Sequence, residues 1–124
     1  LIDLGIKLIS LSDTIGSATP NKINMVYEYF SMKYPNVEFG LHLHSHPQFW
    51  REKVETSIDS GCLRIDGAIQ GFGGCPMASD NMIGNMPTEK IITFCEEKGI
   101  ESGINPLKFE VAYNYASDIF LNYK

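Results

Sequence analysis

Several kinds of residue and segment are scarce in this sequence, and each shortage narrows the class of protein. Lysine and arginine together number 10 against 15 aspartates and glutamates, so the net charge is −5 and no basic cluster forms. We therefore expect neither nucleic acid nor an anionic membrane surface as a partner. No apolar run approaches the roughly 18 residues that a membrane-spanning helix requires, so we expect no membrane span.

Cysteine is also scarce. Three cysteines, an odd number without the spacing of a disulfide scaffold, indicate a reducing compartment. The sequence has no initiating methionine and no signal or transit segment, which leads us to expect a cytoplasmic location. Its first residues, Leu1 to Gly5, are typical of the end of a helix that is closed by glycine. We interpret this opening as the remainder of a helix, and the chain as a piece of a longer protein.

What the sequence does contain is an alternation of strand and helix patterns over 124 residues, a length of about one domain. Apolar runs predict strands at 6–11, 37–44 and 63–69, and helical spacing predicts helices at 20–33, 47–61, 88–98 and from 106 to about 120. A strand about every thirty residues is typical of parallel βα units, so we predict an α/β fold. In such folds, ligand sites lie at the carboxyl ends of the strands.

Polar residues gather at those strand ends. Asp13 follows the first strand, and from the residues alone it could either bind a ligand or cap the loop. His42 and His44 are two apart on the second strand, so both imidazoles point to one side and could share a metal ion. One histidine alone is more often structural, whereas a pair at a strand end favours a metal site. His46 comes after the strand, and we expect it to have no direct role.

A glycine-rich loop at 70–85 follows the third strand; it holds four of the 11 glycines and no lysine, arginine or glutamate. Glycine allows a loop to lie close against a neighbouring segment. Cys75 is either a reactive thiol on a loop that closes over a site or an incidental cysteine in a connection. Asn85 is either a hard oxygen ligand or the residue before a helix cap. Asp66, within the third strand, is interpreted as structural and paired with Arg64 or another neighbour.

Four short motifs follow one another along the chain: Ser12-Asp13-Thr14-Ile15-Gly16, His42-Leu43-His44, Gly71-Phe72-Gly73-Gly74-Cys75-Pro76 and Gly84-Asn85. Together, over about residues 1–100, they resemble the hydroxymethylglutaryl-CoA lyase family of metal-dependent TIM-barrel enzymes. The first two motifs are shared with related lyases and acyl-CoA condensing enzymes, whereas the last two are more particular to the lyase. The resemblance implies a partial TIM (β/α)8 barrel. Residues 1–124 would be its C-terminal portion, the last three βα units plus a C-terminal helix, with the N-terminal strands absent.

The resemblance also implies roles for the residues singled out above. His42 and His44 match the two histidine ligands of a divalent metal, Mg²⁺ or Mn²⁺, and Asn85 matches its amide ligand. Cys75 matches the catalytic loop cysteine, and Asp13 matches an acidic site residue with a structural or proton-handling role. One of the two histidines or Asp13 is the candidate base. The implied reaction cleaves an acyl-CoA substrate, 3-hydroxy-3-methylglutaryl-CoA, into acetoacetate and acetyl-CoA. A homodimer is left open.

Two departures from the family pattern bear on the function. Ser45 stands where the superfamily usually has an aspartate directly after the second histidine, so any orienting role of that aspartate is lost or supplied differently. The family's first-strand aspartate ligand and the neighbouring arginine have no counterpart here, so the chain holds only part of a metal site. Two alternatives stay open: another metal-dependent acyl-CoA lyase or condensing enzyme of the same superfamily, or a noncatalytic fragment that folds or binds a partner.

Overall fold

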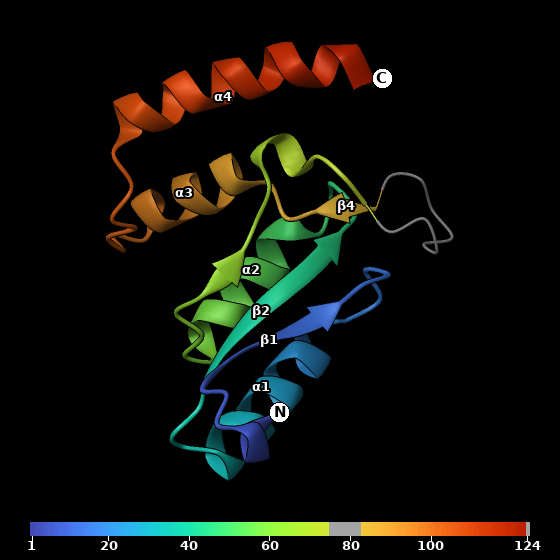
Figure 1. The fold of residues 1–124 in the computed structure, drawn as a ribbon, viewed down its shortest axis with the longest axis vertical. Helices are drawn as coiled ribbons and strands as arrows, with labels where there is room; N and C mark the ends of the chain where they lie inside the picture. Colours follow the sequence, from blue (N-terminus) through green and yellow to red (C-terminus); the bar gives the residue numbers. More distant parts are fainter. Residues whose placement is uncertain (75–82, 124) are drawn as a thin grey trace.

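The computed structural model describes residues 1–74 and 83–123, which form an α/β arrangement around a small sheet (Figure 1). The strands are β1 (Leu8–Asp13), β2 (Glu38–Ser45), β3 (Ile65–Asp66) and β4 (Gly84–Asn85). The α-helices are α1 (Pro20–Lys33), α2 (Trp50–Asp59), α3 (Thr88–Glu97) and α4 (Pro106–Phe120), and three short 3-10 turns are η1 (Ile2–Leu4), η2 (Ile69–Gly71) and η3 (Leu121–Tyr123). Within the two described stretches, none of the helices combines the length and the apolar character that crossing a bilayer requires.

β2 is the central strand of the sheet. β1 and β3 pair with it in parallel, in the order β1-β2-β3, and β4 pairs with it antiparallel at its carboxyl end. The register places Ser12 and Asp66 beside His42, and Asn85 beside His44. The predicted α/β fold with a parallel sheet is thereby confirmed. The antiparallel β4 is an addition that the sequence pattern does not predict.

The two faces of β2 differ in chemistry. Its odd-numbered side chains lie buried against α1 and α2, which cover the same side of the sheet (Figure 1). That core includes Ile23, Tyr27, Phe39, Leu41, Leu43 and Val54. Successive side chains of a strand point to opposite faces, so the even positions from Glu38 to His44 face away from these helices. The helices therefore supply the apolar core, and the open face of the sheet carries the polar groups.

Local capping explains why two of the predicted helices begin where the sequence places them. Thr19 caps α1, because its Oγ1 accepts a hydrogen bond from the backbone N–H of Lys22. Asn105 caps α4 in the same way, through its Oδ1 and the backbone N–H of Lys108 at 3.0 Å. A proline occupies the first turn of each helix, where its missing N–H costs no hydrogen bond. The predictions of helices at 20–33 and from 106 to about 120 are confirmed.

The third strand is much shorter than the predicted span 63–69. Past β3 the backbone leaves the sheet and pairs with the segment that leads into α3. The N–H of Ala68 donates to the carbonyl of Met86, and the N–H of Thr88 donates to the carbonyl of Ala68, both at 2.9 Å. Gly67 permits this approach, because a Cβ there would lie 2.9 Å from Oγ1 of Thr88. The predicted length is wrong because these long-range hydrogen bonds replace the pairing with β2.

Candidate functional site

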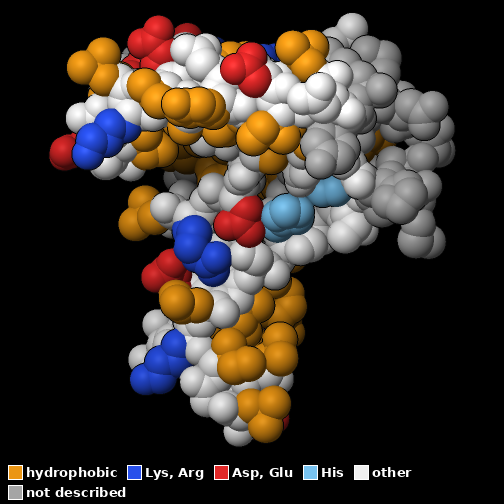
Figure 2. All heavy atoms as spheres, turned by 45° about the horizontal axis from the view of Figure 1, so that its top comes forward, with side chains coloured by type: hydrophobic (Ala, Val, Ile, Leu, Met, Phe, Trp, Pro, Cys, Tyr) orange, Lys and Arg blue, Asp and Glu red, His pale blue; other side chains and the backbone are white. Residues whose placement is uncertain are grey.

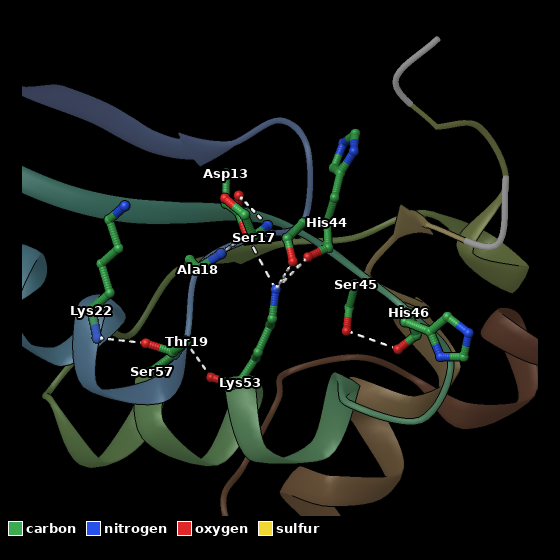
Figure 3. Close-up of polar contacts among 11 residues, drawn as sticks. Asp13, Ser17, Ala18, Thr19, Lys22, His44, Ser45, His46, Lys53 and Ser57 are labelled. Atoms are coloured by element: carbon green, nitrogen blue, oxygen red, sulfur yellow. Dashed lines mark hydrogen bonds and ion pairs between the residues drawn. The ribbon is translucent and has the colours of Figure 1, made fainter. Parts of the chain in front are cut away.

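Two histidines lie together at the carboxyl end of β2. The ring centroids of His42 and His44 are 5.3 Å apart, and the rings are tilted by 55°. The predicted placement of both imidazoles on one side of the strand is confirmed. Figure 3 shows the imidazole of His44 pointing to the side of β2 opposite from Lys53, which comes from α2. The two imidazoles therefore belong to the open face of the sheet.

Asn85 is brought to the same place by β4, which sets it directly opposite His44 in the antiparallel pair. Its side-chain Nδ2 donates a hydrogen bond of 2.9 Å to the backbone carbonyl of Phe72. That bond commits the amide nitrogen, so the oxygen Oδ1 is the atom left for other partners. The structure thus places the predicted amide ligand beside one of the predicted histidine ligands.

The environment of His44 favours its neutral form. Burial lowers the pKa of His44 below its ordinary value, the neighbouring His42 lowers the pKa further, and Asp13 and Asn85 act in the opposite direction. A neutral imidazole is the form that binds a metal. Nδ1 of His44 is buried and has no hydrogen-bond partner among the described residues. A buried nitrogen without a partner is costly unless something binds it, and it fits a metal ligand.

The donor set suits part of a divalent-metal site. Two imidazoles and one amide oxygen are compatible with Mg²⁺ or Mn²⁺, which prefer oxygen ligands but accept imidazole. Among residues 1–74 and 83–123, no group of three or more His, Cys, Asp or Glu side chains is arranged to hold a metal ion. The described part of the chain could therefore supply one side of a coordination shell, and further ligands would complete it.

Asp13 is engaged in organising the loop after β1. Its Oδ1 accepts the backbone N–H of Ser17 at 3.0 Å, and its Oδ2 accepts the backbone N–H of Ala18 at 2.9 Å. The same Oδ2 lies 3.1 Å from the ammonium nitrogen of Lys53. Of the two roles that the sequence leaves open for Asp13, this geometry favours the cap. Its catalytic role stays a prediction.

Lys53 is the functional-site residue that the sequence reasoning missed. It is 4% exposed, and its Nζ donates to Oδ2 of Asp13, to the carbonyl of Gly16 at 2.9 Å and to the carbonyl of His44 at 2.9 Å (Figure 3). One buried cation therefore ties the loop after β1 to the end of β2. The sequence does indicate this burial, because Lys53 lies three residues after Trp50, on the apolar stripe of the predicted helix at 47–61.

The two described ends of the glycine-rich loop, residues 70–74 and 83–85, lie in close backbone contact, and the second end contains β4. Gly71 has φ = 61°, and a Cβ there would lie 2.7 Å from the backbone oxygen of Asn85. The N–H of Asn85 donates to the carbonyl of Gly73 at 3.1 Å. A Cβ on Gly84 would lie 2.9 Å from the carbonyl oxygen of Gly71. Close backbone contact thus accounts for these glycines. Cys75, the predicted catalytic thiol, lies outside the described residues.

Ser45 and His46 come directly after His44, at the carboxyl end of β2. Oγ of Ser45 donates to the carbonyl of His46 at 2.9 Å, and the His46 ring packs near Phe49 with a centroid distance of 5.8 Å. Figure 3 shows the imidazole of His46 pointing away from His44. Ser45 offers a hydroxyl and no carboxylate at this position, and the absence of a direct role for His46 stays a prediction.

Comparison with known proteins relates most of the chain to one family. The family model described as HMGL-like matches residues 1–115. The chain is 33% identical over 104 residues to the hydroxymethylglutaryl-CoA lyase YngG of Bacillus subtilis, which covers 84% of this chain and 34% of that protein. It is 32% identical over 108 residues to the cytoplasmic 3-hydroxy-3-methylglutaryl-CoA lyase of Homo sapiens, with 87% and 29% covered. The chain therefore spans about a third of the length of these curated relatives.

Solved structures agree with this relationship. The crystal structure of the Bacillus subtilis HMG-CoA lyase matches with a TM-score of 0.83 and 30% identity, over 94% of this chain and 39% of that one. An HMG-CoA lyase from Acinetobacter baumannii, in complex with coenzyme A and 3-methylmalate, matches with a TM-score of 0.73 and 32% identity, over 84% and 34% of the two chains. The α/β fold is thus similar to that of a TIM-barrel lyase.

Proposed function

Because the chain belongs to the HMGL-like family, we propose that it supplies one side of the active site of a carbon–carbon lyase. The proposed substrate is 3-hydroxy-3-methylglutaryl-CoA, and the products are acetoacetate and acetyl-CoA. The observation that carries the proposal is the grouping of His42, His44 and Asn85 at the carboxyl end of β2. We place the chain in the last three βα units of the barrel, so the rest of the active site would come from other segments.

His42, His44 and Asn85 are the residues that would hold a divalent cation, Mg²⁺ or Mn²⁺. When bound, such a cation supplies Lewis-acid chemistry that makes a substrate hydroxyl easier to deprotonate. The residues of this chain contribute the geometry. His44 presents a neutral imidazole because burial lowers its pKa, and Asn85 presents its amide oxygen because the carbonyl of Phe72 holds the amide nitrogen.

The reaction needs two proton transfers, and the chain offers a candidate for each. A base removes the proton of the C3 hydroxyl, the C2–C3 bond breaks, and its electron pair stays on C2 as the enolate of acetyl-CoA. We propose that His42 acts either as a ligand of the cation or as that base, since one ring nitrogen cannot do both; it is only partly buried and lies beside the proposed ligand His44. The enolate then takes up a proton, and the family resemblance suggests Cys75 as the donor. Asp13 would act by holding the loop beside the site.

Metal binding tests the first part of the proposal. We expect Mn²⁺, titrated onto the full-length enzyme and followed by calorimetry, to bind, and we expect His42→Ala to abolish that binding. His46→Ala is the matched control, since it removes an imidazole that points away from the site, and it should leave the affinity unchanged. Equal affinity of the wild-type enzyme and His42→Ala would remove His42 from the ligand set.

Product analysis tests the second part. We expect the chain by itself to release no acetoacetate from 3-hydroxy-3-methylglutaryl-CoA, because it spans about a third of its relatives. In the full-length enzyme, Cys75→Ala should reduce acetoacetate release by orders of magnitude while the circular dichroism spectrum stays unchanged. Near-normal release would rule out a catalytic thiol. If the full-length enzyme preferred a different acyl-CoA, it would belong with the related lyases or condensing enzymes. If it turned over no acyl-CoA, a noncatalytic role would be favoured.

A further inference from the structure

The open face of the sheet carries an uninterrupted row of polar side chains across three strands. In register, Ser12 of β1, His42 of β2 and Asp66 of β3 stand side by side. Residues paired in this way present their side chains to the same face. Figure 2 shows histidine side chains next to an acidic and a basic group on this side of the molecule. The row joins the proposed metal ligand His42 to a carboxylate that the proposed function leaves unused.

Asp66 and His42 are direct neighbours. Oδ2 of Asp66 lies 3.5 Å from Nδ1 of His42, and the two side chains are 36% and 37% exposed. An ion pair with that much exposure contributes little to stability, about 0–1 kcal/mol. The stability of the fold therefore gives little reason for the contact. A carboxylate beside a ring nitrogen does have another effect, because it fixes which of the two nitrogens carries the proton.

Asp66 is itself held in position by Ser10 of β1, which reaches it across β2. Oγ of Ser10 donates to Oδ2 of Asp66 at 2.9 Å, and Nη1 of Arg64 donates to Oγ of Ser10 at 3.0 Å. Nη1 of Arg64 also lies 3.9 Å from Oδ1 of Asp66. The carboxylate is thus fixed by a hydroxyl from β1 and by the guanidinium of the residue two positions before it. The interpretation of Asp66 as a partner of Arg64 is correct but incomplete.

Arg64 is placed by a feature of the central strand. Its Nε donates to Oε1 of Glu38 at 3.1 Å. Its guanidinium lies flat over Gly40, where a Cβ would sit 2.6 Å from the Cζ of Arg64. Any other residue at position 40 would displace the guanidinium and, through it, Ser10 and the carboxylate. The glycine therefore belongs to the same arrangement.

We propose that Asp66 is a positioning residue for His42. Because Oδ2 of Asp66 lies 3.5 Å from Nδ1, the carboxylate favours the tautomer that carries its proton on Nδ1, which leaves Nε2 with a lone pair for a metal or a proton. The purpose of this positioning rests on the proposed function, whereas the contact between Asp66 and His42 does not. Asp66 also supplies the orienting carboxylate that Ser45 cannot offer. Ser10 and Arg64 hold Asp66 in place, and we assign neither of them a contact with a ligand.

The tautomer of His42 tests the proposal without any metal. The chain has three histidines, so a ¹⁵N long-range correlation spectrum of the metal-free chain can assign each ring at about pH 8, where an ordinary histidine is neutral. We expect His42 to be protonated at Nδ1 in the wild-type chain and to shift toward the Nε2–H form in Asp66→Ala. A wild-type His42 protonated at Nε2 would overturn the proposal, and this result needs no variant to fold. An unchanged tautomer in Asp66→Ala would overturn it as well.

Metal affinity gives a second, separable readout. Loss of a carboxylate that orients a histidine ligand weakens metal binding by about 10–100-fold. We expect Asp66→Ala to weaken Mn²⁺ binding of the full-length enzyme by that factor in calorimetry or in paramagnetic broadening of the ring signals. Asp59→Ala removes an exposed carboxylate at the end of α2 and should bind Mn²⁺ like the wild type. If the wild-type full-length enzyme binds no Mn²⁺, the proposed function fails, and the tautomer experiment alone still decides the role of Asp66.

Discussion

Replacement of Lys53 by methionine is expected to destabilise the chain by about 3–5 kcal/mol, the usual cost of removing one member of a buried ion pair. Methionine keeps the unbranched shape but loses the charge and three donated hydrogen bonds. The side chains of Lys53 and Asp13 are 5% and 9% exposed, so water cannot replace the lost partner. The carbonyls of Gly16 and His44 also lose their hydrogen-bond donor. The cost of these two hydrogen bonds is included in the about 3–5 kcal/mol, because all of the lost interactions come from Lys53.

Urea unfolding, followed by circular dichroism and by the fluorescence of Trp50, measures this loss. A domain of this size has a total free energy of unfolding of about 5–15 kcal/mol, so the midpoint should move far toward zero urea. Lys108→Met is the matched control. It removes an exposed positive charge from α4 and should change the free energy of unfolding by less than about 0.5 kcal/mol.

A double-mutant cycle separates the charge from the packing. Lys53→Met leaves the carboxylate of Asp13 buried without its cation, whereas Lys53→Met combined with Asp13→Asn leaves no buried charge. The double variant should therefore be more stable than the sum of the two single losses predicts, by about 0.5–3 kcal/mol. Two results would refute the reasoning: a Lys53→Met variant as stable as the control, or a cycle in which the two losses simply add.

Two further predictions concern the loop and the buried thiol. Gly71 and Gly99 both have positive φ, but a Cβ meets a neighbouring atom only at Gly71, where the backbone oxygen of Asn85 would lie 2.7 Å away. Gly99→Ala should cost about 1–2 kcal/mol of backbone strain in urea unfolding, and Gly71→Ala should cost clearly more; equal losses would remove the close contact as a cause. Burial raises the pKa of the Cys62 thiol above its ordinary 9.0, so the thiol ionises first in the unfolded chain. Its contribution to stability is therefore full below about pH 9 and is lost as the pH rises from there through the higher pKa of the folded chain. Between about pH 8 and pH 10 the wild-type chain should lose more stability than Cys62→Ala, and parallel curves would contradict this.

The parts of the structure that could be predicted from the sequence depend on residues near one another in the chain. The start of α1 follows from Thr19 and its proline neighbour, because capping acts within a few residues. The shared side of His42 and His44 follows from the two-residue period of a strand. These rules need no knowledge of which segments meet in space, and the structure bears them out.

The parts that could not be predicted depend on how distant segments meet. The contact between Asp66 and His42 exists because β3 pairs with β2 in one register, and a shift of one residue would turn Asp66 to the other face. The position of Lys53 depends on how α2 lies across the sheet, which a helical period does not fix. The early end of β3 results from the hydrogen bonds between Ala68 and the segment before α3. In each case the missing information is long-range geometry.

The two histidines of the candidate site are held from opposite faces of β2, and this separates stability from binding. Lys53 holds the backbone carbonyl of His44 from the helix side, inside the core, where a lost interaction costs the most. Asp66 contacts the side chain of His42 on the open face, where exposure makes the same kind of interaction nearly neutral for folding. Lys53→Met should therefore lower the free energy of unfolding far more than Asp66→Ala does. Asp66→Ala should change the His42 tautomer and the Mn²⁺ affinity at nearly wild-type stability. If Lys53→Met and Asp66→Ala lost stability and Mn²⁺ affinity in the same proportion, the two faces would act as one unit. The distinction between Lys53, which holds the strand, and Asp66, which orients the ligand, would then fail.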